Sequence, residues 1–279
     1  MGVACEAARE LVARLDGFKA AEQIESEVFR TLVPAITGRW RDAVSADVAA
    51  EPFTSEEEEL RATGDNALIA YGSTLLLAIA GRKWLVLAQI GDGDIVGIQP
   101  SGQPLLPVPG DPSLTGQQTT SLCGARAEED FRAGVVDVAT TALLGVLLAT
   151  DGYGNAQVDD PWADGVSADL AELIGDRSPE WLAGQLPLWA GRCASSDGSA
   201  DDTTLALLIA PSAASRRPGA VSARDELSAA AARRLTQPAA KAVGERAVTR
   251  EQRLAKSAVS DEAGSWPAVG DPDEPPRGQ

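Results

Sequence analysis

Three consecutive apolar runs decide the fold. Residues 67–81 read ALIAYGSTLLLAIAG, residues 83–93 read KWLVLAQIGDG, and residues 94–108 read DIVGIQPSGQPLLPV. Glycine-containing turns separate the runs, which is the pattern of β-strands joined by tight connections. Because the runs are continuous rather than alternating, we expect strands that are covered on both faces by other layers.

Helical periodicity flanks these strands. Apolar residues recur at helical spacing over residues 1 to about 50, where Pro34 is expected to kink or end a helix. Ser178 followed by Pro179 is the expected start of a later helix. The remaining predicted segments are strands at residues 119–123, 131–139, 142–150 and 203–210, and helices at residues 167–177 and 178–194.

The composition changes after Pro211. Residues 212–279 are rich in Ala, Arg, Ser and Pro and end in GDPDEPPRGQ, which predicts a disordered tail. Residues 1–211 are predicted to form one domain, which is ample length for a single core. No apolar stretch reaches the ~20 residues that a transmembrane helix needs, so we expect a cytoplasmic protein.

Charge and composition exclude several classes of function. The chain has 24 Lys and Arg against 41 Asp and Glu, a net charge of -17, which argues against nucleic acid or an anionic membrane as partner. It has no histidine, which excludes Ser-His-Asp catalysis and His-ligated zinc. Its three cysteines, Cys5, Cys123 and Cys193, form no C-x-x-C pair.

Acids recur where predicted strands end. Asp151 follows ALLGVLLAT, Asp201 and Asp202 precede TTLALLIA, and Asp92 and Asp94 flank a glycine between two strands. Such carboxylates favour oxygen ligation of Mg²⁺, Mn²⁺ or Ca²⁺. The alternative is that each Asp-Gly is only a turn, since this dipeptide is common in turns. An EF-hand loop is excluded, because one that starts at Asp151 would place Ala156 where glycine is required.

Four motifs in a fixed order resemble the metal-dependent protein phosphatase family, called PPM or PP2C. The resemblance spans about residues 4–210 and includes a G-S-T strand, a V-G-D-S-R-like hairpin, an L-x-S/T-D-G strand end and a G-S-x-D-N-x-T strand. In this chain they read Gly72-Ser73-Thr74, Ile90-Gly91-Asp92-Gly93, Leu148-Ala149-Thr150-Asp151-Gly152 and Gly198-Ser199-Ala200-Asp201-Asp202-Thr203-Thr204.

The resemblance implies a fold and an activity. The implied fold is α+β, a PP2C-like four-layer α-β-β-α sandwich of two antiparallel sheets. The implied activity is hydrolysis of phosphoserine and phosphothreonine in proteins by a metal-activated water, with two Mg²⁺ or Mn²⁺ ions and a looser third. Its partners would be a phosphorylated protein substrate and a Ser/Thr kinase.

The resemblance also assigns residues to the site. Asp151 and Asp201 match the family's two late metal-binding aspartates, and Asp92 matches the hairpin aspartate that helps to hold the third ion. Gly152 and Asp202 are possible supporting residues, although Asp202 stands where the family has Asn. Asp94 replaces the family's usual Arg.

The family's first motifs are absent from the sequence. A first strand with Arg and an Asp-Gly that bridges both metals is expected before the helix GVACEAARELVARL at residues 2–15, but no Asp-Gly precedes it. We therefore expect an N-terminally truncated sandwich that lacks its first strands, has unpaired sheet edges and is weakly active from Met1. The alternatives are an inactive PPM-like module that binds a phosphoprotein or kinase, and a metal-independent structural domain.

Overall fold

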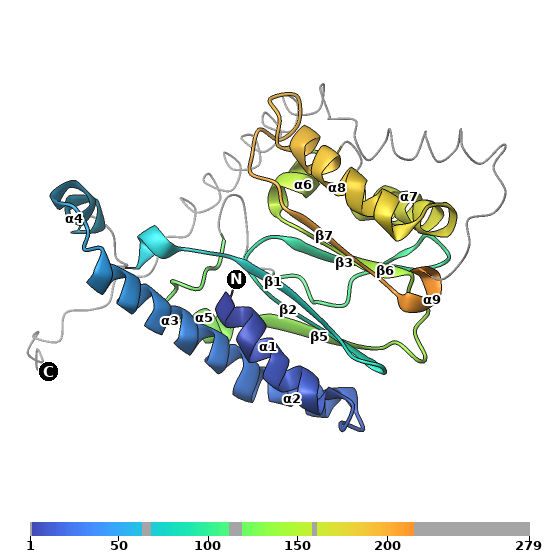
Figure 1. Cartoon of the computed structure of the whole chain (residues 1–279), viewed down its shortest axis with the longest axis horizontal. Helices are drawn as coiled ribbons and strands as arrows, with labels where there is room; N and C mark the ends of the chain where they lie inside the picture. The colour runs from blue at the N-terminus through green and yellow to red at the C-terminus, as the bar shows by residue number, and fades with distance from the viewer. Residues whose placement is uncertain (1, 63–67, 112–118, 158–160, 215–279) are drawn as a thin grey trace, which may run out of the picture. The chain divides into compact units, whose positions relative to one another are not determined.

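The structure is a computed structural model that describes residues 2–62, 68–111, 119–157 and 161–214 (Figure 1). These residues all belong to the first of the two units, Met1–Ala240 and Lys241–Gln279, into which the chain divides. The predicted tail lies outside the described residues except for its first three. These belong to helix α9, Pro211–Ala214, in which Ala213 is buried, so folded structure continues past residue 211.

Helices form the first fifth of the chain, as the periodicity predicts. They are α1 (Gly2–Leu15), α2 (Ala21–Glu27) and α3 (Val33–Ala50), and a π-helical segment η1 (Val28–Leu32) joins the last two. The helical run continues through Pro34, so the expectation that Pro34 ends a helix is wrong, whereas a kink there stays a prediction. This proline lies in the first turn of α3, where its missing N–H is tolerated, and the wider π turn comes directly before it.

The predicted strands form, with one exception. They are β1 (Leu75–Ala80), β2 (Trp84–Ile90), β3 (Asp94–Ile98), β4 (Pro104–Leu105), β5 (Arg132–Asp137), β6 (Gly145–Ala149) and β7 (Leu205–Ile209). The remaining helices are α4 (Ser55–Ala62), η2 (Ile69–Tyr71), α5 (Ala127–Asp130), α6 (Asp151–Asn155), α7 (Trp162–Asp176) and α8 (Pro179–Cys193). Ser178 caps α8 by accepting a hydrogen bond from the Trp181 amide, as predicted.

The exception is the segment at residues 119–123, which is a turn and not a strand. Its backbone makes one hydrogen bond to the segment just before β1, from the Leu122 amide to the Ser73 carbonyl at 2.9 Å. Its hydroxyl groups bond to nearby backbone instead of leaving that backbone to a ladder: Ser121 Oγ accepts from the Ser73 amide and Thr120 Oγ1 from the Gly91 amide. Such side-chain bonds compete with sheet pairing.

The strands form two antiparallel sheets with the orders β1-β2-β5 and β4-β3-β6-β7. In the second sheet Asp94 of β3 lies opposite Ala149 of β6, which in turn lies opposite Leu205 of β7. The start of β3, the end of β6 and the start of β7 therefore meet at one end of this sheet. The fold thus brings the ends of three segments distant in sequence close together.

Alternating side chains place each sheet between other layers. In β2, Trp84 and Val86 face the core that α1, α2 and α3 cover, whereas Leu85 and Leu87 face the second sheet. On the far side of the second sheet, Leu147 packs in a core with residues of α6, α7 and α8. Helices thus cover the outer faces of both sheets (Figure 1), as the continuous apolar runs predict.

Among the residues that the structure describes, no helix is long and apolar enough to cross a bilayer.

Candidate functional site

Asp151 lies at the end of β6 and is the first residue of the short helix α6. Gly152 follows it and is buried against the loop before β7. A β-carbon at Gly152 would lie 2.6 Å from the Asp202 carbonyl oxygen, so only glycine permits this approach. The predicted L-A-T-D-G and G-S-A-D-D-T-T motifs are therefore in direct contact.

Asp201 and Asp202 lie in the exposed loop before β7. The Asp201 carboxylate accepts a hydrogen bond from the Asp202 amide at 2.8 Å, which turns the chain into the strand. Thr150 ties this loop to β6, because its amide donates to the Thr204 carbonyl and its hydroxyl oxygen accepts from the Thr204 amide. Asp201 is thereby held on the same side of the sheet end as Asp151.

Asp92 lies in the turn between β2 and β3, and Asp94 is the first residue of β3. Gly91 has a φ of 105°, a left-handed conformation that favours glycine. The Gly93 backbone runs close to β6, where a β-carbon would lie 2.8 Å from the Ala149 carbonyl oxygen. Thr119 donates to the Asp92 carboxylate at 2.9 Å. The turn therefore presents its acids beside the end of β6.

The carboxylates influence one another electrostatically. Burial raises the pKa of Asp151, and the charges of Asp92 and Asp201 raise it further. Burial, followed by the charges of Asp151 and Asp92, raises the pKa of Asp94 to about 6, against a lowering effect from Arg132. These shifts require charges near enough to repel one another. The structure thus brings Asp92, Asp151 and Asp201 to one end of the molecule's second sheet.

Asp94 is the site residue that the assignment by resemblance missed. It is partly buried, like Asp92 and Asp151 and unlike Asp201 and Asp202, and its carboxylate lies 3.3 Å from where a β-carbon of Gly154 would stand. The sequence held a signal for it, since an acid is unusual as the first residue of an apolar strand. Asp202 takes part differently, because its carbonyl oxygen packs against Gly152 while its side chain is exposed.

The donor chemistry of this site fits a hard divalent cation. All its candidate ligating groups are carboxylate oxygens, which Mg²⁺ and Mn²⁺ prefer, and a cation would relieve the repulsion between them. The geometry is open, however. Over residues 2–62, 68–111, 119–157 and 161–214, no three carboxylate or thiol groups are close enough together to hold an ion. The aspartates converge without forming a closed cage.

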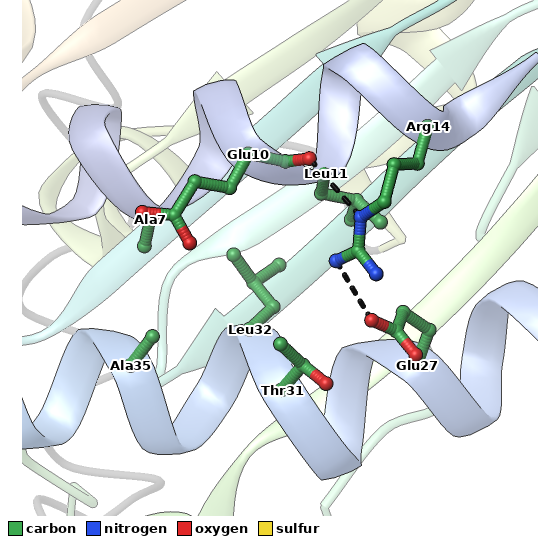
Figure 2. A pocket seen from close by; sticks show the side chains of 8 residues that line it. All are labelled: Ala7, Glu10, Leu11, Arg14, Glu27, Thr31, Leu32 and Ala35. Carbon is green, nitrogen blue, oxygen red and sulfur yellow. Dashed lines mark hydrogen bonds and ion pairs between the residues drawn. The ribbon is translucent and has the colours of Figure 1, made fainter.

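A hollow elsewhere in the molecule does not offer a comparable site. It lies between α1 and the α2–η1–α3 segment and has a volume of about 10 Å³. Figure 2 shows Arg14 extended toward Glu27 across it, and the two side chains form an ion pair at 2.8 Å. This volume accommodates about one water molecule, so the hollow is a feature of helix packing.

The sequence of this chain matches the model of a known protein family. The family model described as protein phosphatase 2C matches residues 2–187, more than half of the chain. This chain belongs to the protein phosphatase 2C family. The match includes the turn with Asp92 and the end of β6 with Asp151, and it stops before the loop with Asp201. No curated protein matches this PP2C chain significantly.

Solved structures of a bacterial serine phosphatase are similar to this PP2C chain. The structure without a substitution has 16% sequence identity, covers 77% of this chain and 80% of that one, and has a TM-score of 0.44. A variant with one substitution has 17% identity, 74% and 76% coverage, and the same TM-score.

Proposed function

We propose that this chain is a Mg²⁺- or Mn²⁺-dependent phosphatase that hydrolyses phosphoserine and phosphothreonine in proteins. One observation carries the proposal: three segments distant in sequence meet at one end of the second sheet, namely the turn with Asp92 and Asp94, the end of β6 with Asp151 and the loop with Asp201. There the charges of Asp92 and Asp201 raise the pKa of Asp151. The family match supports the same reaction class, a phosphoric monoester hydrolase. The layered packing supports the finer assignment of the fold as the family's four-layer α-β-β-α sandwich.

Each residue has a role in this proposal. Asp151 and Asp201 are the principal metal ligands, and Asp92 helps to hold a further ion. Gly152 permits the close approach of the two segments that carry Asp151 and Asp201. When bound, the metal supplies Lewis acidity toward a water molecule and the phosphoryl oxygens. The substrate would be a phosphoprotein, with a Ser/Thr kinase as partner and the cytoplasm as location.

A second function is favoured by the open spacing of the carboxylates. No three of the described acids are placed to hold an ion, and a two-metal hydrolase needs well-ordered ligands. A PP2C-like module that binds a phosphoprotein or kinase without turnover would fit such spacing. Metal dependence and turnover separate this function from the first.

The test is hydrolysis of a phosphothreonine peptide with increasing Mn²⁺. We expect Mn²⁺-dependent release of phosphate that Asp151→Asn reduces by at least about 100-fold, since it removes a ligand from a two-metal reaction. Asp42→Asn is the matched control, because Asp42 is an exposed acid on α3. Peptide binding without phosphate release would establish the binding module, and neither binding nor release would leave a structural domain.

A further inference from the structure

Arg132, the first residue of β5, contacts the turn that carries Asp92. Its Nη2 donates to the Gly91 carbonyl oxygen at 2.5 Å, and its Nη1 donates to the Pro109 carbonyl oxygen at 3.0 Å. Two donors of one planar guanidinium thus hold two separate backbone segments. Lysine cannot reproduce this arrangement, because its ammonium is a point charge without a fixed fork.

Gln89 holds the same turn from the neighbouring strand. It lies directly opposite Arg132 in the β2–β5 pair, so both side chains are on one face of the sheet. Gln89 is 4% exposed, and its Nε2 donates to the Gly91 carbonyl oxygen at 3.3 Å and to the Gly93 carbonyl oxygen. The Gly91 carbonyl thereby accepts from both side chains.

These bonds act on a turn that carries like charges. Asp92 and Asp94 lie on either side of Gly93, and both are near enough to Asp151 to interact with its charge. Their repulsion favours any movement that carries the turn away from the end of β6. The bonds from Arg132 and Gln89 oppose that movement, and the positive charge of Arg132 offsets part of the repulsion at Asp94.

We infer that Arg132, together with Gln89, is a positioning residue that holds the Gly91–Gly93 turn so that Asp92 and Asp94 stay beside Asp151. Arg132 acts through the turn and does not touch the substrate. Its role at a metal site rests on the proposed function, whereas its role as a brace of the turn does not. The two roles can therefore be tested separately.

The first arm measures hydrogen exchange in the metal-free protein. Arg132→Lys keeps the charge but loses the fork, so exchange at the amides of residues 91–94 should rise about tenfold as the turn opens more often. Arg126→Lys is the control, since Arg126 is a nearby exposed arginine with only a 3.7 Å pair to Glu129. Unchanged exchange in Arg132→Lys, with circular dichroism that shows a folded protein, would overturn the brace.

The second arm measures Mn²⁺ binding by calorimetry. Residues that support metal ligands typically contribute about 10- to 100-fold to metal affinity, so Arg132→Lys should raise the Mn²⁺ Kd about tenfold. If Arg132→Lys does not fold, Gln89→Met replaces it in both arms with the same expected direction. Faster exchange with an unchanged Kd would overturn the positioning role. A wild-type protein that binds no Mn²⁺ would instead contradict the proposed function. The hydrogen-exchange experiment would still test whether Arg132 holds the turn, because it uses the metal-free protein.

Discussion

The two acidic segments of the site differ in how they are held. The Gly91–Asp94 turn receives bonds from the side chains of Gln89 and Arg132, and it packs against β1 and β6. The loop at residues 199–202 is bonded to the end of α8 and to the end of β6: Ser199 donates to the Cys193 carbonyl, and the Thr150 hydroxyl donates to the Asp202 carbonyl. Both segments are bonded to neighbouring elements, and the turn is the more buried of the two.

The acids of the two segments differ in burial. Asp92 and Asp94 are partly buried, whereas Asp201 and Asp202 are exposed. The bonded Gly91–Asp94 turn can hold carboxylates close together against their repulsion, and this lowers the free energy of unfolding of the metal-free protein.

The largest expected change in stability comes from a substitution in the Gly91–Asp94 turn. Gly91→Ala would place a methyl group 2.4 Å from Thr74 Cγ2 at a φ of 105°. We expect a loss of about 2–4 kcal/mol in the free energy of unfolding, from backbone strain and overpacking together. Urea unfolding measures it, with Gly110→Ala as control, because no atom of the residues that the structure describes lies within 4 Å of a β-carbon at Gly110. Equal stability of the two variants would show that the turn is not rigid.

The next effect distinguishes a partly buried acid from an exposed one. The folded-state pKa of Asp94 is about 6, above its ordinary value of 3.8. The contribution of Asp94 to wild-type stability should therefore fall as pH rises from about 4 through 6, because the folded state must release a proton that it binds more tightly than the unfolded state does. Asp94→Asn removes this cost and should stabilise the metal-free protein by about 2 kcal/mol at pH 7.5, with the gain disappearing near pH 4.

Thermal unfolding in a chelator at several pH values measures this gain. Asp202→Asn provides the comparison, since an exposed acid should change stability by less than about 0.5 kcal/mol. A loss of stability in Asp94→Asn at pH 7.5 would mean that hydrogen bonds to the carboxylate outweigh its burial and repulsion.

The smallest expected change in the free energy of unfolding concerns the exposed loop at residues 199–202. Ala200 has a φ of 55°, which an L-residue adopts at some cost. Ala200→Gly relieves that strain and increases the entropy of the unfolded chain, and we expect a net gain of about 0.5–1 kcal/mol. Chemical denaturation measures it. A destabilised variant would show that the Ala200 side chain makes contacts on which the loop depends.

Local signals made much of this fold predictable. The apolar runs at β1 and β2, the cap at Ser178 and the apolar run before Asp151 identify their elements by composition and spacing alone. Residues 119–123 were predicted wrongly because their β-propensity was not weighed against hydroxyl bonds to the Ser73 and Gly91 backbone. Those bonds depend on segments about 30–50 residues away, which no short window contains.

The candidate site was predictable only where local sequence identifies its residues. Asp92, Asp151 and Asp201 could be named because each stands at the end of an apolar run. Two features depend on strand register. The partial burial of Asp94 follows from the pairing of β3 with β6, and the contact of Arg132 and Gln89 with the turn follows from the pairing of β2 with β5. Register between strands distant in sequence is set by the whole core, so these residues required the structure.

The central claim is that the partly buried Gly91–Asp94 turn and the exposed loop at residues 199–202 hold one divalent-cation site together. Calorimetric titration of Mn²⁺ tests it most directly, with the wild-type chain, Asp92→Asn from the turn, Asp201→Asn from the loop and Asp42→Asn as control. We predict binding by the wild type and the control, and a Kd at least about tenfold higher in each of the other two variants, since each loses a charged ligand. Wild-type affinity in both Asp92→Asn and Asp201→Asn would contradict the account.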